Sequence, residues 1–404
     1  MTPNKPNRPQ AALWDAVARG AFDFFWRETD PKTGLTKDRA RNYANERDAN
    51  YNVASVASTG YALAALPVGV TRGWVTKKEA EARAQTTLRF LATKLPHEHG
   101  FFYHFVDWRD GKRVWNCELS SIDTSLLVLG ALTAGQFFGG QIQRDANALY
   151  ARLDWPWMQN RTASDPAGVA PSMGWKPENG FIPARWAGYT EALYLYLLAL
   201  GAPRPLPRAA WDALTFPEAT VEGQKVFGGP APLFFAQMTP AYFDLRNRRD
   251  SHGRDWWTNF TNAHQADVAF SKRSAARFAT FREGLWGVTA CDQPGGYGAH
   301  EPRDGSSDGT IAPTAMAAGA LFIPDEAERG LTILREKFGD KAWGRYGFCN
   351  ALNVGKNWFD RDVIGIDLGM TLLCLENKRS GLIWRLTGSH PSLRGGLAAA
   401  GLDA

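Results

Sequence analysis

The chain has 404 residues, of which 44% are hydrophobic and 22% are charged, and its formal net charge is +5. This composition is ordinary for a globular protein, and no uninterrupted apolar run approaches the roughly 18 residues that indicate a membrane-spanning helix. Because the basic residues are spread along the chain without a long block, neither nucleic acid nor a membrane is indicated as a partner.

The first ten residues are polar and rich in proline, and they predict a flexible tail over 1–10. They lack the apolar stretch of a signal peptide, so we expect a cytoplasmic protein, or a periplasmic one if a leader has been trimmed from this end. The four cysteines lie far apart and form no Cys-x-x-Cys unit, which favours reduced thiols over disulfides.

Four segments carry apolar residues on one face at helical spacing, near residues 13–24, 80–95, 142–153 and 327–338. The second of them begins with the capping box Thr76-Lys-Lys-Glu79, in which each end residue satisfies a backbone N–H of the first turn. We expect each segment to form a helix with one buried face and one solvent face.

Five other segments are apolar or small on nearly all sides, namely 53–66, 121–138, 190–200, 313–322 and 368–375. A helix without a polar face must be covered all round, so the alternation of the two kinds predicts an outer ring of helices around an inner ring. The expected fold is all-α, a single (α/α)6 barrel (toroid) over 11–385. Short β-hairpin insertions in loops, such as the one around Asp110-Gly111, complete it, and a C-terminal tail follows over 386–404.

Carboxylates stand at the starts of these all-round apolar helices: Glu118, Asp123, Glu191, Asp308 and Asp367. If the inner helices run parallel, their first turns meet at one end of the barrel and the acids become neighbours. Such a group can divide into one protonated and one ionised carboxyl, as glycoside hydrolysis requires. For any single acid the alternative is helix capping, because Asp and Glu stabilise first turns.

The chain is rich in aromatic residues, with 16 Trp, 11 Tyr and 23 Phe, many of them in loops bounded by glycine or proline. A flat apolar face with a polar edge suits stacking under a sugar ring. Trp186, Tyr189, Trp286 and Tyr297 lie near the acids in the sequence, although packing in the core is an equal alternative for each.

The segment Glu118-Leu-Ser-Ser-Ile-Asp-Thr-Ser-Leu-Leu127 strongly resembles the bacterial glucoamylase-like family that includes endo-β-1,2-glucanases. The resemblance continues in order between residues 35 and 385. It includes Ser172-Met-Gly-Trp175, Gly188-Tyr-Thr-Glu-Ala192, Leu285-Trp-Gly-Val-Thr-Ala-Cys-Asp292, Asp308-Gly-Thr-Ile-Ala-Pro-Thr314 and Trp358-Phe-Asp360. It implies an (α/α)6 barrel that cleaves a β-1,2-glucosidic bond with inversion, without an obligatory metal or other cofactor.

In the family that the chain resembles, the essential acids fall in the Ser-Ile-Asp-Thr and Gly-Tyr-x-Glu-Ala motifs, which here carry Asp123 and Glu191. We predict that Glu191 is the general acid and that Asp367 or Asp123 activates water. The predicted substrate-binding residues are Glu118, Trp186, Tyr189, His264, Trp286, Asp292, Tyr297 and Asp308. No metal ligand is predicted.

The expected partner is therefore a glucan or a gluco-oligosaccharide substrate, and the oligomeric state stays open. Two alternatives remain at this stage. One is a transglycosylase, or a hydrolase of another linkage, that uses the same acids, because acids alone do not encode linkage. The other is a non-catalytic toroid that binds oligosaccharides.

Overall fold

The computed structural model describes residues 8–43, 51–161 and 169–402 and is rich in helix. The helices are α1 (Arg8–Arg27), α2 (Val56–Thr71), α3 (Lys77–Thr93), α4 (Ser121–Phe138), α5 (Gly140–Ala151), α6 (Trp155–Gln159), α7 (Leu193–Leu200), α8 (Arg208–Asp212), α9 (Phe234–Tyr242), α10 (Trp256–Arg273), α11 (Ala279–Arg282), α12 (Pro313–Gly319), α13 (Pro324–Ala342), α14 (Gly365–Ser380), α15 (Leu382–Ser389) and α16 (Pro391–Ala399).

The strands are short: β1 (Arg39–Arg41), β2 (Val53–Ser55), β3 (His97–Glu98), β4 (Phe101–Phe102), β5 (Phe105–Asp107), β6 (Leu119–Ser120), β7 (Gly174–Lys176), β8 (Gly180–Phe181), β9 (Glu218–Val221), β10 (Gln224–Phe227), β11 (Ala290–Gln293), β12 (Gly296–Ala299), β13 (Trp343–Gly344), β14 (Gly347–Phe348), β15 (Leu352–Asn353), β16 (Trp358–Phe359) and β17 (Asp362–Ile364). Within the described ranges they pair antiparallel, and no sheet has more than three strands.

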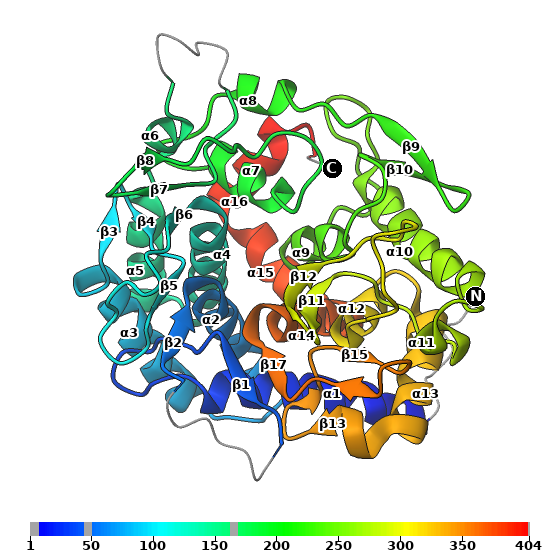
Figure 1. Ribbon diagram of the computed structural model, residues 1–404. Coiled ribbons are helices and arrows are strands. Elements are labelled where there is room, and N and C mark those ends of the chain that lie inside the picture. The colour runs from blue at the N-terminus through cyan, green and yellow to red at the C-terminus, as the bar shows by residue number, and fades with distance from the viewer. Residues whose placement is uncertain (1–7, 44–50, 162–168, 403–404) are drawn as a thin grey trace.

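The helices fall into the two kinds that the sequence predicts. α2, α4, α7, α12 and α14 are buried along almost their whole length. α3, α5 and α13 bury one face only, and the buried positions include Ala80, Ala146 and Leu331. In Figure 1, α2, α4 and α14 lie near the centre of the molecule, and α1, α3, α5 and α13 lie nearer its rim.

Two of the central helices touch through their backbones. A Cβ atom added to Gly130 of α4 would lie 1.8 Å from the carbonyl oxygen of Gly60 of α2, and one added to Gly60 would lie 2.4 Å from the carbonyl oxygen of Leu126. Real Cβ atoms do not approach oxygen so closely, so this crossing requires glycine at both positions.

Short strands lead directly into three of the central helices: β2 into α2, β6 into α4 and β17 into α14. β17 pairs with β1, which places Arg39 opposite Ile364 and Arg41 opposite Asp362. Strand pairing therefore fixes the segment that contains Arg39 and Arg41 beside the first turn of α14.

The C-terminal region differs from the prediction of a tail over 386–404. Most of these residues form the end of α15 and the whole of α16, which packs against α7. Leu393, Leu397 and Leu402 are buried, so the segment belongs to the core. At the other end α1 begins at Arg8, inside the tail predicted over 1–10, and residues 1–7 lie outside the described residues.

One described helix, α4, is long and apolar enough to span a membrane by length and composition alone. Since 83% of its 18-residue window is buried inside the protein, its apolar character is explained by its place in the core. The four cysteines are likewise buried, and all are free thiols.

Candidate active site

Three carboxylates predicted from the sequence come together at the starts of central helices. Asp123 lies in the first turn of α4, Asp367 lies in the first turn of α14, and Glu191 lies in the turn just before α7. The charge of Asp123 acts on the pKa of Glu191, and the charges of Asp367 and Glu191 both act on the pKa of the Tyr297 phenol. Asp123, Glu191 and Asp367 therefore share one electrostatic neighbourhood, which we call the acid cluster.

The Glu191 carboxyl is held in its neutral form. Burial raises its pKa to about 8, the negative charge of Asp123 adds to this rise, and the nearby His104 opposes it. Among the described residues no hydrogen-bond partner is found for this carboxyl, and the residue is only half-buried. At neutral pH Glu191 is thus protonated, and its proton is not donated in a hydrogen bond to another described residue.

Asp123 is held in place from two sides. The Ser120 hydroxyl caps α4 by accepting from the Asp123 N–H at 3.2 Å and donates back to Asp123 Oδ2 at 2.5 Å. His104 Nε2 lies 3.5 Å from the same oxygen, and His104 Nδ1 lies 3.1 Å from Glu118 Oε1. One imidazole therefore links the two acids of the Glu118-Leu-Ser-Ser-Ile-Asp123 motif.

His104 carries a positive charge at neutral pH. Burial alone would lower its pKa, but the charge of Asp123 and the hydrogen bond and charge of Glu118 raise it to about 9. In return, the hydrogen bond from His104 lowers the pKa of Glu118 against the effect of burial. Glu118 therefore serves as an ionised partner of His104.

Asp367 has one oxygen engaged and one open. The side-chain amide of Asn350 donates to Asp367 Oδ2 at 2.6 Å, whereas Oδ1 has no hydrogen-bond partner among the described residues. Burial raises the pKa of Asp367 to about 7; the Asn350 hydrogen bond lowers it, and the charge of Asp292 raises it. The Asn350 donor favours the ionised form of Asp367, whereas no such donor reaches Glu191 among the described residues, so Asp367 ionises more readily than Glu191.

A second group of acids lies beside Asp367. The carboxylates of Asp292, Asp360 and Asp362 offer oxygen atoms within 4.8 Å of one another, a spacing that could hold a cation. Arg39 Nη1 lies 2.8 Å from Asp292 Oδ2, and Arg41 Nη1 lies 3.1 Å from Asp362 Oδ1. Since two guanidinium groups already neutralise these acids, a metal ion would have to compete with them.

Asp360 is buried, as is Asp292, and among the described residues Asp360 Oδ2 has no hydrogen-bond partner. Burial, followed by the charge of Asp292, raises the pKa of Asp360 above its ordinary value. A raised pKa favours the neutral form of Asp360, which limits the negative charge next to Asp367.

Tyr297 stands at the edge of the acid cluster. It lies in β12 directly opposite Asp292 of β11, and 58% of the residue is exposed. The protein around its hydroxyl and the charges of Asp367 and Glu191 raise its pKa, although the ring itself remains accessible. This predicted substrate-binding residue is thus available beside both acids.

The structure places two predicted substrate-binding residues, His264 and Trp286, inside the core. His264 is fully buried in α10, with Nδ1 2.7 Å from the carbonyl oxygen of Phe260 and Nε2 2.8 Å from the amide of Gln237. Trp286 is 2% exposed and donates to the carbonyl oxygen of Glu326 at 3.3 Å. The sequence alone does not distinguish an aromatic or polar residue that lines a site from one that is buried in the core.

Three further candidates occupy supporting positions. Trp186 is buried, and its indole donates to Ser121 Oγ at the start of α4 at 2.8 Å. Tyr189 packs among aromatic rings and accepts a hydrogen bond from Asn259 at 3.2 Å. The Asp308 carboxylate is engaged by Lys356 at 2.6 Å and by the Thr310 N–H at 2.9 Å. None of the three contacts the acid cluster directly in the described residues.

The sequence did not single out Asn350 or Arg39, and it gave His104 no definite role. Asn350 contacts both Asp367 and the backbone of Asp292, and Arg39 reaches Asp292 across 253 positions of sequence. The available signal was that His104 falls in Phe102-Tyr-His-Phe105, and that Asp360 and Asp292 fall in further motifs that resemble the family. Side chains that meet through loops and strand pairing leave no periodic pattern.

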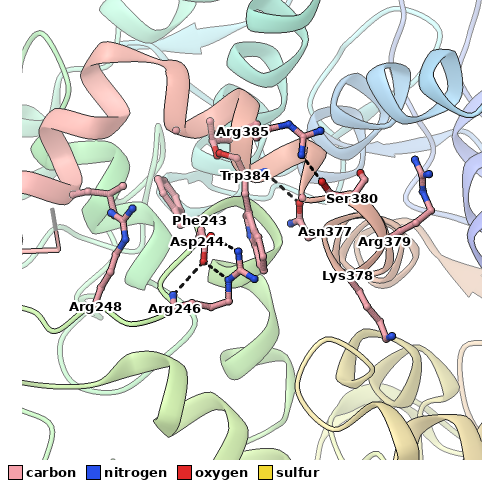
Figure 2. A pocket seen from close by; sticks show the side chains of 14 residues that line it. Phe243, Asp244, Arg246, Arg248, Asn377, Lys378, Arg379, Ser380, Trp384 and Arg385 are labelled. Atoms are coloured by element: carbon pink, nitrogen blue, oxygen red, sulfur yellow. Dashed lines mark hydrogen bonds and ion pairs between the residues drawn. The ribbon is translucent and has the colours of Figure 1, made fainter. Parts of the chain in front are cut away.

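A separate cavity of about 440 Å³ lies at the opposite end of α14. Its lining includes Arg246, Arg248, Lys378, Arg379 and Arg385, and Figure 2 shows Arg246 held by Asp244 beside the Trp384 ring. Asp367 lies in the first turn of α14 and Lys378 in its last, and a 16-residue helix is ~24 Å long. This basic cavity is therefore not part of the acid cluster.

The acid cluster offers a neutral carboxyl and a second one that ionises more readily, the two kinds of group that glycoside hydrolysis uses. A family model described as "Putative glucoamylase" matches residues 183–391, just over half of the chain, and the chain belongs to this family. The family resemblance seen in the sequence is thereby confirmed.

Individual relatives agree with this assignment. The exo β-1,2-glucooligosaccharide sophorohydrolase (non-reducing end) of Parabacteroides distasonis is 27% identical over 431 residues, covering 95% of this chain. The chain spans 57% of the length of that relative.

Solved structures share the fold along almost the whole chain. A putative glucoamylase from Bacteroides caccae has a TM-score of 0.88 at 27% identity, with 97% of this chain and 99% of that chain covered. The endo-β-1,2-glucanase of Chitinophaga pinensis, in complex with sophorotriose and glucose, has a TM-score of 0.88 at 23% identity, with 97% and 98% covered. At that level of identity the likeness shows the fold alone.

Proposed function

We propose that the protein is a glycoside hydrolase that cleaves β-1,2-glucan or its oligosaccharides with inversion, on an (α/α)6 barrel. The observation that carries the proposal is the acid cluster at the starts of the central helices, in which Glu191 has no hydrogen-bond partner among the described residues and Asp367 receives the Asn350 amide. The choice of linkage is supported by family membership and by the β-1,2-linked substrates in the names of the relatives.

Glu191 acts as the general acid. Its proton is donated to the glycosidic oxygen as the bond to the anomeric carbon breaks, which lets the leaving sugar depart as a neutral alcohol. A carboxyl with a pKa of about 8 is mostly protonated at neutral pH, and because no partner reaches it from the described residues, its proton is available to the substrate.

Asp367 acts as the general base. Its open Oδ1 accepts a proton from the water that attacks the anomeric carbon, and its Oδ2 stays fixed by Asn350. After one turnover Glu191 is ionised and Asp367 is protonated, so exchange of one proton with solvent restores both groups.

Asp123 is the alternative base, but two side chains, Ser120 and His104, engage it, whereas Asn350 alone among the described residues engages Asp367. Asp123 Oδ2 already receives the Ser120 hydroxyl and lies beside the His104 imidazolium. We therefore assign Asp123 to binding sugar hydroxyls and to keeping the Glu191 carboxyl neutral by its negative charge.

The first test is Glu191→Gln, which keeps the shape of the side chain and removes the proton. Release of reducing sugar from β-1,2-glucan should fall by about 10² to 10⁴-fold while circular dichroism stays unchanged. Glu283→Gln is the matched control, because that carboxylate is paired with Lys337 at 2.7 Å outside the acid cluster and its loss should leave the rate nearly unchanged. Full activity of Glu191→Gln would remove this residue from the mechanism.

The second test separates hydrolysis from transfer and from other linkages. The protein is incubated with linear and cyclic β-1,2-glucans and with maltooligosaccharides, and the products are resolved by chromatography and by NMR of the anomeric proton. Hydrolysis with inversion predicts α-configured new reducing ends from the β-1,2-glucans only. New linkages without net hydrolysis would instead identify a transglycosylase, and binding without turnover on every glucan would identify a carbohydrate-binding protein.

A further inference from the structure

Two large hydrophobic side chains stand exposed among the described residues, Trp115 at 63% and Tyr297 at 58%. The charges of Asp367 and Glu191 act on the Tyr297 phenol. The Trp115 ring contacts Phe105 with centroids 5.0 Å apart, and Phe105 stacks on His104 at 3.8 Å. His104 in turn lies against Asp123. Each exposed ring is therefore linked to the acid cluster, Tyr297 through Asp367 and Glu191 and Trp115 through Asp123.

Trp115 occupies a backbone position that does not suit tryptophan. The Cys117 N–H donates to the Val114 carbonyl oxygen at 3.2 Å, which closes a four-residue turn. The two central residues, Trp115 and Asn116, have φ angles of 56° and 47°, so both lie in the left-handed region. Turns with two such residues favour Asn, Asp and Gly, and a bulky side chain there is strained.

The surrounding contacts hold this turn rigidly. The Val114 N–H donates to the Phe105 carbonyl oxygen at 3.1 Å, and Arg113 Nε donates to the Cys117 carbonyl oxygen at 2.5 Å. Arg113 is itself paired with Glu178 at 2.5 Å. The Trp115 backbone is strained, and its exposed ring adds little buried surface to the fold. Strain of this kind at an exposed residue points to a role in binding a ligand.

We propose that Trp115 is a stacking platform for a glucosyl unit of the substrate that lies away from the bond being cleaved. This proposal rests on the proposed function and adds a specificity-determining residue to it. Phe105 and His104 separate Trp115 from Asp123, so the sugar on Trp115 is not the sugar whose bond breaks. A glucan bound at this platform extends from it towards the acids, and the platform favours chains long enough to reach it.

Trp115→Asn is the decisive variant, because Asn accepts the left-handed backbone and has no ring. For β-1,2-gluco-oligosaccharides long enough to reach the platform, we expect KM to rise about tenfold. For the shortest oligosaccharide that is cleaved, kcat and KM should stay unchanged. The melting temperature should be equal to or higher than that of the unaltered protein, since the strain of the turn is relieved.

Two further variants complete the design. Trp115→Phe keeps a stacking face and should recover most of the affinity for long chains. Phe137→Ala removes a half-buried aromatic ring near the C-terminal end of α4, opposite Asp123, and should leave the chain-length dependence unchanged. The proposal is overturned if Trp115→Asn has the same KM as the unaltered protein at every chain length, or if the loss is equal for short and long substrates.

Failure of the platform is distinguishable from failure of the proposed function. If the unaltered protein hydrolyses β-1,2-glucan but Trp115→Asn changes nothing, only the platform is wrong. If no glucan is hydrolysed, the proposed function is wrong, and calorimetric binding of the same oligosaccharides to the unaltered and Trp115→Asn proteins still tests the platform. Equal affinity of the two proteins in that measurement overturns it.

Discussion

Asn350 donates its side-chain amide to Asp367 Oδ2 at 2.6 Å, while its own Oδ1 accepts the backbone N–H of Asp292 at 2.9 Å. A donor to a carboxylate stabilises the ionised form, so this contact counteracts the burial that raises the pKa of Asp367. Asn350 is therefore a positioning residue, since it acts on the reaction through Asp367.

Replacement of Asn350 by alanine should move the acidic limb of the activity profile. Without the hydrogen bond the pKa of Asp367 rises above about 7, so kcat/KM should fall at neutral pH and its acidic limb should shift upwards by roughly one pH unit. The measurement is kcat/KM on β-1,2-gluco-oligosaccharides between pH 5 and pH 10. A lower rate with an unmoved limb would indicate a purely structural role.

The unaltered protein should show a narrow pH optimum. Asp367 must be ionised, so activity rises as pH passes about 7, and Glu191 must be protonated, so activity falls as pH passes about 8. A profile that is flat across these values would contradict the assignment of the two acids.

His104→Gln should shift the alkaline limb alone. The positive charge of His104 lowers the pKa of Glu191, so its removal raises that pKa and extends activity to higher pH. The maximal rate should fall about tenfold or more, because Asp123 loses one of its contacts and sugar hydroxyls bind less well. Movement of the alkaline limb to lower pH would show that His104 does not act on Glu191 by its charge.

Gly130→Ala should destabilise the protein by separating α2 from α4. The added methyl group would meet the Gly60 carbonyl oxygen at 1.8 Å, and overpacking of this kind costs about 1–3 kcal/mol. Urea unfolding followed by circular dichroism measures the loss. Gly395→Ala is the matched control in α16, where nothing lies within 4 Å, and it should be neutral or stabilising by about 0.5–1 kcal/mol.

Glu376→Gln should lower stability through a buried ion pair at the far end of α14. Glu376 is fully buried and accepts from Arg72 at 2.9 Å and Arg379 at 2.7 Å, and breaking such a pair costs about 3 kcal/mol. Burial raises its pKa, but hydrogen bonds from Arg379, Ser380 and Arg72 bring it below the usual value.

The sign of the pH dependence follows from that lowered pKa. The ion pair contributes its full stability above the unfolded carboxyl pKa of about 4.3 and loses it as pH falls through the lower folded value. The difference in unfolding free energy between the two proteins should thus be largest near pH 7 and narrow in acid. A constant difference down to pH 3 would exclude this ionic contribution.

The sequence predicted the two kinds of helix well, because periodicity reports directly whether one face or all faces are covered. It also predicted the helix starts that carry Asp123, Glu191 and Asp367. It did not predict the helices over 386–404, where Leu393 and Leu397 are the only two leucines of the short helix α16 and give a weak signal. It also could not show that His264 and Trp286 are buried, since the type of a residue does not reveal which way its side chain faces.

By itself the sequence determined which helices are buried, which acids begin them and which family the chain resembles, because these properties reside in local pattern and residue order. Only the tertiary structure decided which groups act on one another. It placed His104 between Glu118 and Asp123, Asn350 on Asp367, and Arg39 on Asp292. The acidity of a carboxyl depends on burial and on charges a few ångströms away, and those neighbours come from distant parts of the chain that only folding brings together.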